Sequence, residues 1–487
     1  MENKTIIQII CETAQLHGER LFVVDDKSEY TYEQGWNRIC RIYRRLTELN
    51  IKKSDCIMAE CTQDADYIFC NFACNLAGAI FVPIEHKASQ ARVEDIFSET
   101  EAVLFVRNSE YDLELKSVTY DEIVGDEAAW VSEFPKLFET AEILYTTGTT
   151  GKSKGIEITH ENNVALAENI AYGTGMKEGN AELIPLPLSH SHAIRCAYAN
   201  FFRKGTVIIK DGIMRVKEIY DSIVKYEISA MDLSPTAVSV LLKLSRGKFA
   251  DFNDQLDYIQ IGTAPLPEET KEQMISLFPR VRLYNFYGST ESGRSCALNF
   301  NSEDNRKYCV GRPTKNAHFI VVDDSGKEIN SSADNTGLLA CRGAMNMKGY
   351  WKQPKLTDEI MRDGYIYSQD EAYIDEEGRV YVFGRKADII NYKGIKIAPE
   401  EIEQVAGAFK GIADCACVPE SDPVAGQVPK LYIMVKFPER FDRNELQRYL
   451  AKNLDANKLP KIIEFIDEIP RTSNGKLQRN KLTKKNG

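Results

Sequence analysis

The sequence predicts an α/β protein built from more than one domain. Its 487 residues are too many for a single ordinary hydrophobic core. In the first 140 residues, an expected strand, Cys56–Ala59, is followed by an apolar run of helical length, Tyr67–Gly78, and by a second expected strand, Ile80–Ile84. Strands that alternate with helices favour a parallel sheet covered by helical layers.

Helices and turns are expected at several further places along the chain. A helix is expected after Tyr30, because apolar side chains recur there at helical spacing, at Ile39, Ile42, Tyr43 and Leu46. Thr159 is a suitable N-cap for another helix. Later, Tyr373–Phe383 is typical of a β-hairpin, and Pro399–Glu403 has the proline and acidic residues of a helix start.

The overall composition is that of an ordinary globular protein, with 43% hydrophobic and 27% charged residues. A net charge of −11 argues against a general binder of nucleic acids or membrane surfaces, so an anionic substrate would need a local cluster of positive groups. The most apolar stretch, Phe72–Ile84, is too short to cross a bilayer, and the N-terminal apolar run is too short for a signal peptide. We therefore expect a cytoplasmic protein without a membrane span.

Cysteines and histidines give little indication of a metal site. The twelve cysteines are scattered and are expected to be buried thiols in a reducing compartment. Cys415 and Cys417 lack metal-site spacing and are expected to pack within a strand. His190 and His192 form a lone pair of histidines, for which a structural role is favoured over zinc binding.

One loop has the composition of a phosphate-binding turn. After the expected strand Ile143–Tyr145, four threonines and two glycines fill the six positions from Thr146 to Gly151, and Lys152 and Lys154 follow. Glycines expose backbone N–H groups, while threonine hydroxyls and lysines add donors and positive charge. The glycine spacing is not that of a Walker loop. A flexible surface loop has a similar composition, so both interpretations stay open from composition alone.

A second polar segment, Phe286–Glu291, follows the expected strand Val281–Asn285. The ring of Tyr287 can stack on a planar group, and the hydroxyl of Thr290 can donate a hydrogen bond. Glu291 offers an oxygen ligand for Mg²⁺, which takes one or two carboxylates together with phosphate oxygens. The alternative for Glu291 is a solvated surface carboxylate, but its position after a buried strand and a glycine favours the metal-binding interpretation.

Three segments together resemble the signature motifs of the adenylate-forming, or AMP-binding, superfamily, which includes acyl-CoA and aryl-CoA ligases, peptide-synthetase adenylation domains and beetle luciferases. They are Tyr145–Gly155, Phe286–Glu291 and Pro470–Arg479, and they follow the order of the family. Weaker similarities, such as Met347–Trp351, extend the resemblance over essentially the whole chain. Ser153 replaces the proline that usually precedes the last lysine of the first motif.

The resemblance implies two domains. A large N-terminal AMP-binding domain, residues 1–384, would contain α/β layers and a β-barrel-like subdomain. Residues 385–487 would form a small mobile α+β lid domain. The implied hinge is the segment 385–389, with Ala387 at a position where relatives usually carry Asp or Lys.

The resemblance also implies the residues of the ATP and AMP site. The phosphate loop would supply Thr146, Thr147, Gly148, Thr149, Thr150, Gly151 and Lys154. The surroundings of the adenine would be Gly262, Thr263, Ala264, Asn285, Tyr287 and Gly288, with Thr263 in place of a family glycine. Asp370 would hold the ribose hydroxyls and Arg385 would contact ribose or phosphate. Gln369 stands where the family has a glycine.

For the acid substrate, the resemblance assigns His190 and Ser289 to the acyl pocket, with further walls near Asp232–Pro235. Ser189 stands where amino-acid-activating relatives carry the aspartate that pairs with the substrate ammonium group. A buried ammonium without a carboxylate partner is costly, so α-amino acids are disfavoured.

The implied reaction has two steps. A carboxylate attacks the α-phosphorus of Mg-ATP and gives an acyl-adenylate and pyrophosphate, with Thr290, Glu291 and Lys476 as catalytic residues and Glu291 as the Mg²⁺ ligand. The lid then rotates, withdraws Lys476 and brings in the loop of Gly394, where the thiol of CoA displaces AMP.

Two alternatives to a CoA ligase stay open at this point. In the first alternative, the protein transfers the acyl group to the phosphopantetheine of a carrier protein. In the second, it is a nucleotide-binding relative without catalytic activity. Lys476, Glu291, Asp370 and Arg385 are all retained, which argues against the loss of catalysis. The substitutions at Ser153, Gln369 and Ala387 leave that alternative open.

Overall fold

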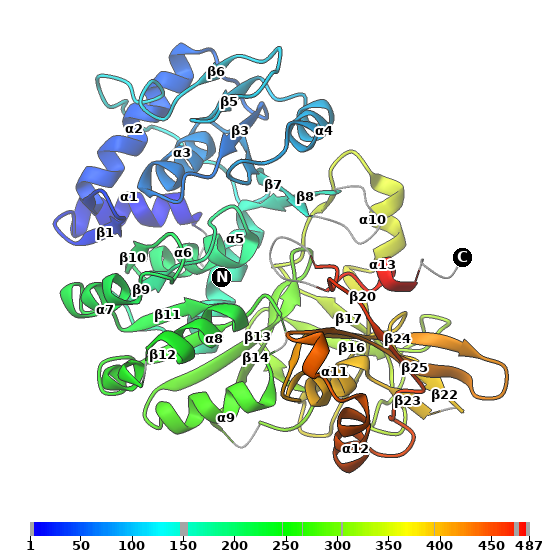
Figure 1. Cartoon of the computed structure of the whole chain (residues 1–487). Helices are drawn as coiled ribbons and strands as arrows, with labels where there is room; N and C mark the ends of the chain where they lie inside the picture. Colours follow the sequence, from blue (N-terminus) through cyan, green and yellow to red (C-terminus); the bar gives the residue numbers. More distant parts are fainter. Residues whose placement is uncertain are drawn as a thin grey trace. The chain divides into compact units, whose positions relative to one another are not determined.

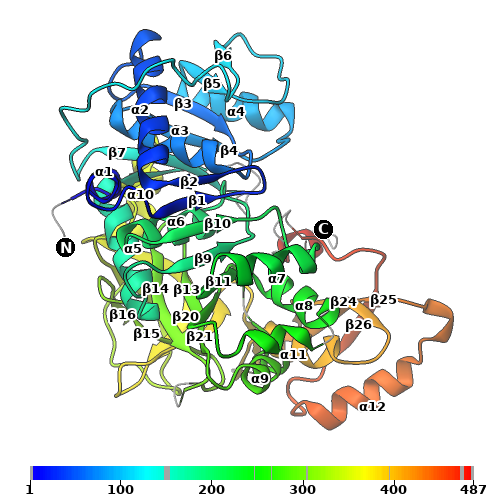
Figure 2. The same cartoon turned by 90° about the vertical axis from the view of Figure 1, so that its left-hand side faces the viewer.

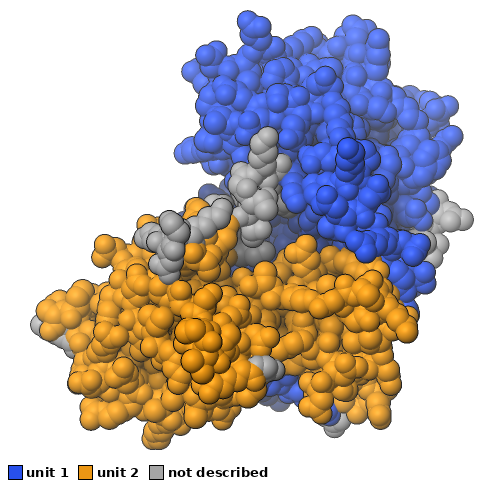
Figure 3. Space-filling model, turned by 90° about the vertical axis from the view of Figure 1, so that its right-hand side faces the viewer, with its two compact units in different colours: residues 1–146, 153–319, 341–366 blue, residues 147–152, 320–340, 367–487 orange. Residues whose placement is uncertain are grey.

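A computed structural model of the chain describes residues 4–146, 154–245, 247–264, 266–302, 305–393, 395–471 and 477–483, without the side chains of Thr146 and Arg440. These residues form two compact units, shown in separate colours in Figure 3. Unit 1 takes its described residues from 4–146, 154–319 and 341–366, and unit 2 from 320–340 and 367–483. Both units mix helices and strands (Figures 1 and 2), which confirms the predicted α/β class. The division at residue 384 into a body and a moving lid stays a prediction.

The first sheet of unit 1 confirms the predicted alternation of strand, helix and strand. β3 (Cys56–Glu60) and β4 (Ile80–Ile84) pair in parallel, and α3 (Ala65–Leu76) connects them. Every residue of both strands is buried, as expected for a parallel sheet covered on both faces. The strand order is β18-β8-β7-β4-β3-β5-β6. The remaining strands are β5 (Leu104–Val106), β6 (Ser117–Val118), β7 (Thr140–Thr146), β8 (Lys154–Thr159) and β18 (Gly349–Tyr350).

The second sheet of unit 1 carries the adenine and acyl motifs. Strands β13, β12, β11, β9, β10 and β1 are neighbours in this order, and each neighbouring pair is parallel. β14 and β15 extend the sheet beyond β13, and β2 extends it beyond β1, all in antiparallel pairing. The bounds are β1 (Leu21–Val24), β2 (Glu29–Thr31), β9 (Ala181–Ile184), β10 (Thr206–Ile209), β11 (Ala230–Leu233), β12 (Tyr258–Ile261), β13 (Arg282–Ser289), β14 (Gly293–Asn299) and β15 (Cys309–Pro313).

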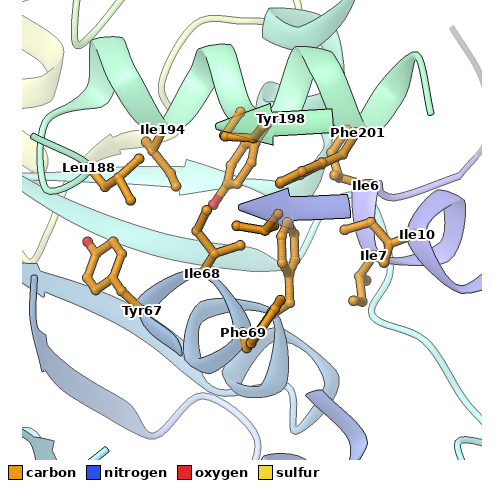
Figure 4. Close-up of a cluster of buried hydrophobic side chains, with 14 of the residues drawn as sticks. Ile6, Ile7, Ile10, Tyr67, Ile68, Phe69, Leu188, Ile194, Tyr198 and Phe201 are labelled. Carbon is orange, nitrogen blue, oxygen red and sulfur yellow. The ribbon is translucent and has the colours of Figure 1, made fainter. Parts of the chain in front are cut away.

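The helices expected after Tyr30 and at the predicted cap Thr159 are both present, and the helices of unit 1 share a large core. α2 (Tyr32–Glu48) and α5 (His160–Thr174) follow capping boxes at Thr31 and Thr159. Aromatic side chains of α3 and α6 (Ser191–Phe202) meet in a buried cluster that α1 (Ile6–Leu16) completes (Figure 4). Further helices are α4 (Gln90–Thr100), α7 (Val216–Lys225), α8 (Pro235–Leu244), the 3₁₀ helix Lys248–Phe252, α9 (Glu268–Leu277) and α10 (Pro354–Ile360).

Four strands contribute their residues wholly or mostly to unit 2 and are neighbours in the order β16 (His318–Val322), β17 (Gly337–Arg342), β20 (Tyr365–Ile374) and β21 (Val380–Arg385). The short strand β19 (Met361–Arg362) pairs with the start of β20. β20 and β21 form the predicted hairpin, and Gly378 takes a left-handed φ of 77° in its turn.

The rest of unit 2 is an α+β arrangement, as the resemblance implied. Its sheet has the order β23-β22-β25-β24, with β26 beside β25. Apolar side chains of the sheet and of helices α11 and α12 form one core. The bounds are β22 (Ile390–Tyr392), β23 (Ile395–Ile397), α11 (Pro399–Gly407), β24 (Ile412–Asp422), β25 (Gly426–Val435), the 3₁₀ helix Pro438–Arg440, α12 (Arg443–Asn453), β26 (Ile462–Phe465) and α13 (Asn480–Thr483).

The cysteine side chains are buried, as predicted from the sequence. All twelve cysteines are buried and free, and Cys415 and Cys417 lie on β24. Within the described residues, no helix combines the length and apolar character needed to cross a membrane.

Candidate active site

The predicted adenine and acyl segments meet at one edge of the second sheet. β9 leads to His190, β12 leads to Gly262, and β13 contains Tyr287. Because these strands are parallel, their carboxyl ends lie at the same edge, which is where open α/β sheets bind ligands. Ile261 pairs with Asn285 in the register of β12 and β13, so the two predicted adenine motifs lie side by side. Thr263 and Ala264, which follow β12, are exposed.

Gly288 shapes the turn that carries the predicted catalytic residues. A β-bulge interrupts the pairing of β13 and β14 between Tyr287 and Gly288. A Cβ atom at Gly288 would lie 1.7 Å from the backbone oxygen of Gly293, so a larger residue requires the backbone to move. Thr290 and Glu291 therefore stand in the tight turn between β13 and β14.

Tyr350 connects Glu291 with the predicted phosphate-binding lysine. Its hydroxyl donates a hydrogen bond to Oε1 of Glu291 at 3.0 Å. The Nζ atom of Lys154 lies 5.2 Å from the centroid of the Tyr350 ring. The pairing of β18 with β8 places Tyr350 there, opposite Ile156. No role of Tyr350 was predicted from the sequence, although its segment Met347–Trp351 resembles a family landmark.

The carboxylate of Glu291 and its surroundings are suited to bind a magnesium ion. One carboxylate oxygen accepts the Tyr350 hydroxyl, and no described residue donates a hydrogen bond to the other. Mg²⁺ uses one or two carboxylates and takes its remaining ligands from substrate phosphates and water. The oriented carboxylate of Glu291 meets that requirement.

The predicted phosphate loop connects two antiparallel strands. Thr146 at the end of β7 pairs with Lys154 at the start of β8. Five of the predicted phosphate contacts lie outside the described residues: Thr147, Gly148, Thr149, Thr150 and Gly151. The strand before the loop is anchored by Glu142, which forms a buried ion pair with Arg195 at 2.7 Å.

In unit 2, two further residues that are predicted to contact the nucleotide form an ion pair with each other. Asp370 and Arg385 face each other across the hairpin of β20 and β21, and Nε of Arg385 lies 3.1 Å from Oδ1 of Asp370. Arg385 also donates a hydrogen bond to the backbone oxygen of Ser368 at 2.6 Å. This second bond keeps the guanidinium group, which is about half exposed, next to the Asp370 carboxylate.

The predicted hinge forms a hydrogen-bonded turn between β21 and β22. The amides of Asp388 and Ile389 both donate to the carbonyl of Arg385, and Ala387 is exposed. Its role as a pivot stays a prediction. Gly394 and Lys476, the predicted CoA and catalytic residues, lie outside the described residues.

Two residues that stand where the family has glycine adopt left-handed backbone angles, which glycine takes more easily than other residues. Gln369 has a φ of 62° and Thr263 a φ of 77°. This conformation costs a non-glycine residue about 1–2 kcal/mol. We expect Gln369→Gly and Thr263→Gly each to raise the free energy of unfolding by about 0.5–1 kcal/mol, since the greater freedom of glycine in the unfolded chain offsets part of the gain.

Urea unfolding followed by far-UV circular dichroism measures this effect. Gln273→Gly on an exposed position of α9 is the matched control, and it is expected to lower the free energy of unfolding by about 1 kcal/mol. A destabilised Gln369→Gly variant would show that contacts of the Gln369 side chain outweigh the backbone strain.

The acyl-pocket residues lie at the start of α6 and at the end of β13. His190 is the N-cap residue of α6, and burial lowers the pKa of its imidazole below the usual value. The hydroxyl of Ser289 accepts the amide hydrogen of Ser292 at 3.1 Å, which holds Ser289 in its turn. His192 is also mostly buried and bonds Asp232 at 2.8 Å through Nε2.

Behind His192 lies a buried polar network that the sequence analysis did not predict. Arg294 donates hydrogen bonds to Oε1 of Gln260 at 2.5 Å and to the backbone oxygen of His192 at 3.1 Å. Gln260 in turn donates to Glu182, whose pKa is raised to about 7 by burial and by the charge of Asp232. No motif signals this network, because its members lie on five separate elements.

Comparison with known proteins identifies the family. The model of the AMP-binding enzyme family matches residues 11–351, and that of the AMP-binding enzyme C-terminal domain matches residues 401–476. The 2-succinylbenzoate–CoA ligase of Staphylococcus epidermidis is 29% identical over 475 residues, which cover 97% of this chain and 96% of the relative. The probable CoA ligase CCL5 of Humulus lupulus is 30% identical over 352 residues, 71% of this chain but only 63% of the relative.

Solved structures show the same fold. The o-succinylbenzoate CoA synthetase MenE of Bacillus subtilis, in complex with the acyl-adenylate OSB-AMP, matches with a TM-score of 0.86 and 24% identity over 97% of both chains. ATP-bound MatB of Rhodopseudomonas palustris matches with a TM-score of 0.86 and 20% identity over 99% of both chains. The two family models match most of the chain's length, and they establish that the chain belongs to the AMP-binding enzyme family.

Proposed function

We propose that the protein is an ATP-dependent acid–thiol ligase. It forms an acyl-adenylate from a carboxylic acid and ATP with release of pyrophosphate, and then transfers the acyl group to CoA with release of AMP. The observation that carries this proposal is the similarity to a curated CoA ligase over 97% of the chain. The two curated relatives are named as a CoA ligase and a probable CoA ligase, which supports CoA over a carrier protein as the acceptor.

The residues of unit 1 supply contacts for adenylation. Lys154 and Thr290 donate to phosphate oxygens of ATP, and Tyr287 stacks on the adenine. Tyr350 orients Glu291, which would hold Mg²⁺, and the ion would supply positive charge against the phosphates. This assignment is supported by the contacts of Tyr350 with Glu291 and Lys154.

The segments of unit 2 complete the cycle. Asp370 accepts hydrogen bonds from the ribose hydroxyls, and Arg385 orients Asp370. Residues 385–487 rotate about the turn 385–389, which exchanges Lys476 for the loop of Gly394 between the two steps. The use of ATP and CoA and the twelve free, buried thiols support a location in the cytoplasm.

The direct test is AMP release from Mg-ATP with a panel of carboxylic acids, with and without CoA. We expect AMP to form with one class of acid and its rate of release to rise sharply with CoA. The amount of AMP should equal the amount of thioester formed. Exchange of pyrophosphate into ATP without stimulation by CoA would indicate a carrier protein as the acceptor. ATP binding without turnover for any acid would favour the non-catalytic alternative.

Tyr350→Phe tests the proposed magnesium site. The hydroxyl orients a ligand carboxylate, and loss of such an outer contact typically costs 10- to 100-fold in metal affinity or activity. We expect about a 10-fold rise in the Mg²⁺ concentration that gives half-maximal pyrophosphate exchange. Tyr172→Phe, on an exposed position of α5, is the control and should leave this concentration unchanged. An unchanged Mg²⁺ dependence of Tyr350→Phe would remove Glu291 from the proposed ligand set.

A further inference from the structure

His192 presents one unused ring nitrogen at the ligand-binding edge of the sheet. Its Nε2 is bonded to Oδ1 of Asp232, whereas no described residue hydrogen-bonds Nδ1, and the side chain is 13% exposed. The ring packs directly on Gly262, the first residue of the predicted adenine loop. A Cβ atom at Gly262 would lie 2.2 Å from Cε1 and 2.8 Å from Nδ1 of His192. The edge of the ring that carries Nδ1 therefore lies against the first residue of the predicted adenine loop.

The surroundings of His192 decide which ring nitrogen carries the proton. Asp232 is fully buried. Burial favours its neutral form, but His192 and Arg294 hold the pKa of the carboxyl below its usual value, so it is ionised and only accepts hydrogen bonds. Burial and the charge of Arg294 lower the pKa of His192, so the imidazole is neutral near pH 7. The single ring proton lies on Nε2, toward Asp232, and Nδ1 is a bare acceptor.

The position of the ring is fixed from two sides. Arg294 donates to the backbone oxygen of His192 at 3.1 Å and lies 3.5 Å from Oδ1 of Asp232. The guanidinium group thus supports both the backbone of the histidine and the carboxylate that orients its ring. An acceptor held in this way has a defined direction, which selectivity between similar ligands requires.

A metal ion is a poorer explanation of the same residues. His192, Cys196 and Asp232 place one ligand atom each within 4.8 Å of one another. However, Arg294 already contacts the Cys196 sulfur at 2.7 Å and supplies positive charge at that point. Burial also raises the pKa of the Cys196 thiol, which disfavours the thiolate that binds metals.

We propose that His192 is a specificity-determining residue of the acid pocket, and that the acid carries a neutral hydrogen-bond donor, a hydroxyl or uncharged amino group, which bonds to Nδ1. This inference rests on the proposed ligase function. A neutral acceptor backed by the Asp232 carboxylate repels a second carboxylate on the substrate, and an alkyl or unsubstituted aryl group leaves Nδ1 without a partner. An unsatisfied, mostly buried polar group costs about 1–3 kcal/mol, or about 10- to 100-fold in selectivity.

The test uses acids that share a carbon skeleton and differ at one position. Benzoate, hydroxybenzoate and carboxybenzoate form one set, and the corresponding cinnamates form another, each with the substituent at the 3- or 4-position. The value of kcat/KM for acid-dependent pyrophosphate exchange is measured without CoA. We expect the hydroxy acid to exceed both the unsubstituted acid and the dicarboxylic acid by at least about 10-fold in one set.

Two variants of similar size separate recognition from a structural role. His192→Gln can still donate toward Asp232 but has no acceptor at the position of Nδ1, whereas His192→Asn keeps a polar atom near Nδ1 and loses the bond to Asp232. We expect His192→Gln to abolish the hydroxyl preference, so that kcat/KM for the hydroxy acid and for the unsubstituted acid come within about 3-fold of each other. His192→Asn is expected to retain part of the preference. If His192 has only a structural role, His192→Gln would retain more of the wild-type behaviour than His192→Asn.

The outcomes are distinguishable from failure of the proposed function. If neither these acids nor the wider panel of carboxylic acids supports exchange in the wild-type protein, the ligase proposal itself fails. Exchange that is fastest with an unsubstituted or dicarboxylic acid, or a hydroxyl preference that persists in His192→Gln, overturns only the inference about His192. Stoichiometric zinc in the purified protein that is lost in His192→Gln would also overturn it, in favour of a metal site.

Discussion

Replacement of Lys476 by alanine is expected to reduce adenylation by about 100-fold or more, with ATP affinity changed only a few-fold. A positive group delivered to the reaction centre stabilises the negative charge that develops as the carboxylate attacks the α-phosphorus. Removing one such preorganised electrostatic contact typically costs 10²- to 10³-fold in kcat. ATP keeps its other proposed contacts, among them Lys154 and Asp370, so binding is expected to persist.

The segment around Lys476 is attached to the sheet of unit 2 on both sides. Arg471 and Leu477 pair as an isolated antiparallel bridge, and Lys476 itself lies outside the described residues between them. Arg471 forms two hydrogen bonds of 2.7 Å to the carboxylate of Asp414, and Leu477 packs against a cluster of buried side chains that includes Val418. Arg471 and Leu477, which flank the segment of Lys476, are therefore held on the sheet of unit 2.

Pyrophosphate exchange and equilibrium binding of ATP, measured on the same preparation, test the role of Lys476. Lys481→Ala, an exposed lysine of the same basic segment, is the matched control and should change neither quantity by more than about 2-fold. If Lys476→Ala loses ATP binding and turnover to the same extent, the lysine is a binding residue and does not act on the developing charge.

The largest effect on stability is expected when the ion pair of Glu142 and Arg195 is broken. Both side chains are about 2% exposed, and Nη1 of Arg195 lies 2.7 Å from Oε1 of Glu142. Asn163 donates to the same oxygen at 2.6 Å. Removing one partner of a buried pair leaves an uncompensated charge and costs about 3–5 kcal/mol. Glu142→Leu is therefore expected to lower the free energy of unfolding of unit 1 by about this amount.

A double-mutant cycle tests the origin of this loss. Replacing both residues, as Glu142→Leu with Arg195→Met, is expected to recover most of the stability, because a hydrophobic pair of similar volume carries no buried charge. Asp221→Ala breaks the exposed pair of Lys217 and Asp221 and should cost less than about 1 kcal/mol. Strictly additive losses at Glu142 and Arg195 would show that the two charges do not stabilise each other.

Prediction from the sequence was most complete where the signal is local. The apolar runs of the sequence are sufficient to predict β3, α3 and β4, because the hydrophobic pattern of each element is contained in its own residues. Caps are local too, which is why the helix after Thr159 begins where the sequence indicates. The family was predicted from short motifs in a fixed order, and the family models confirm it.

The substitutions within those motifs could not be interpreted from the sequence. Gln369 and Thr263 replace family glycines, which left open whether the turns change. In the structure both residues adopt left-handed backbone angles, so the surrounding fold imposes the turn despite its cost. Backbone angles at such positions depend on the packing of the neighbouring strands, which a single sequence does not show.

The sequence by itself determined the class of this protein, the order of its motifs and the residue types available for nucleotide chemistry. Only the tertiary structure decided the partners of those residues: Tyr350 for Glu291, 59 positions apart, and Asp232 for His192, 40 positions apart. The reason is physical. Hydrogen bonds and ion pairs act over a few ångströms in space, and the pairing of distant strands and helices decides which side chains come that close.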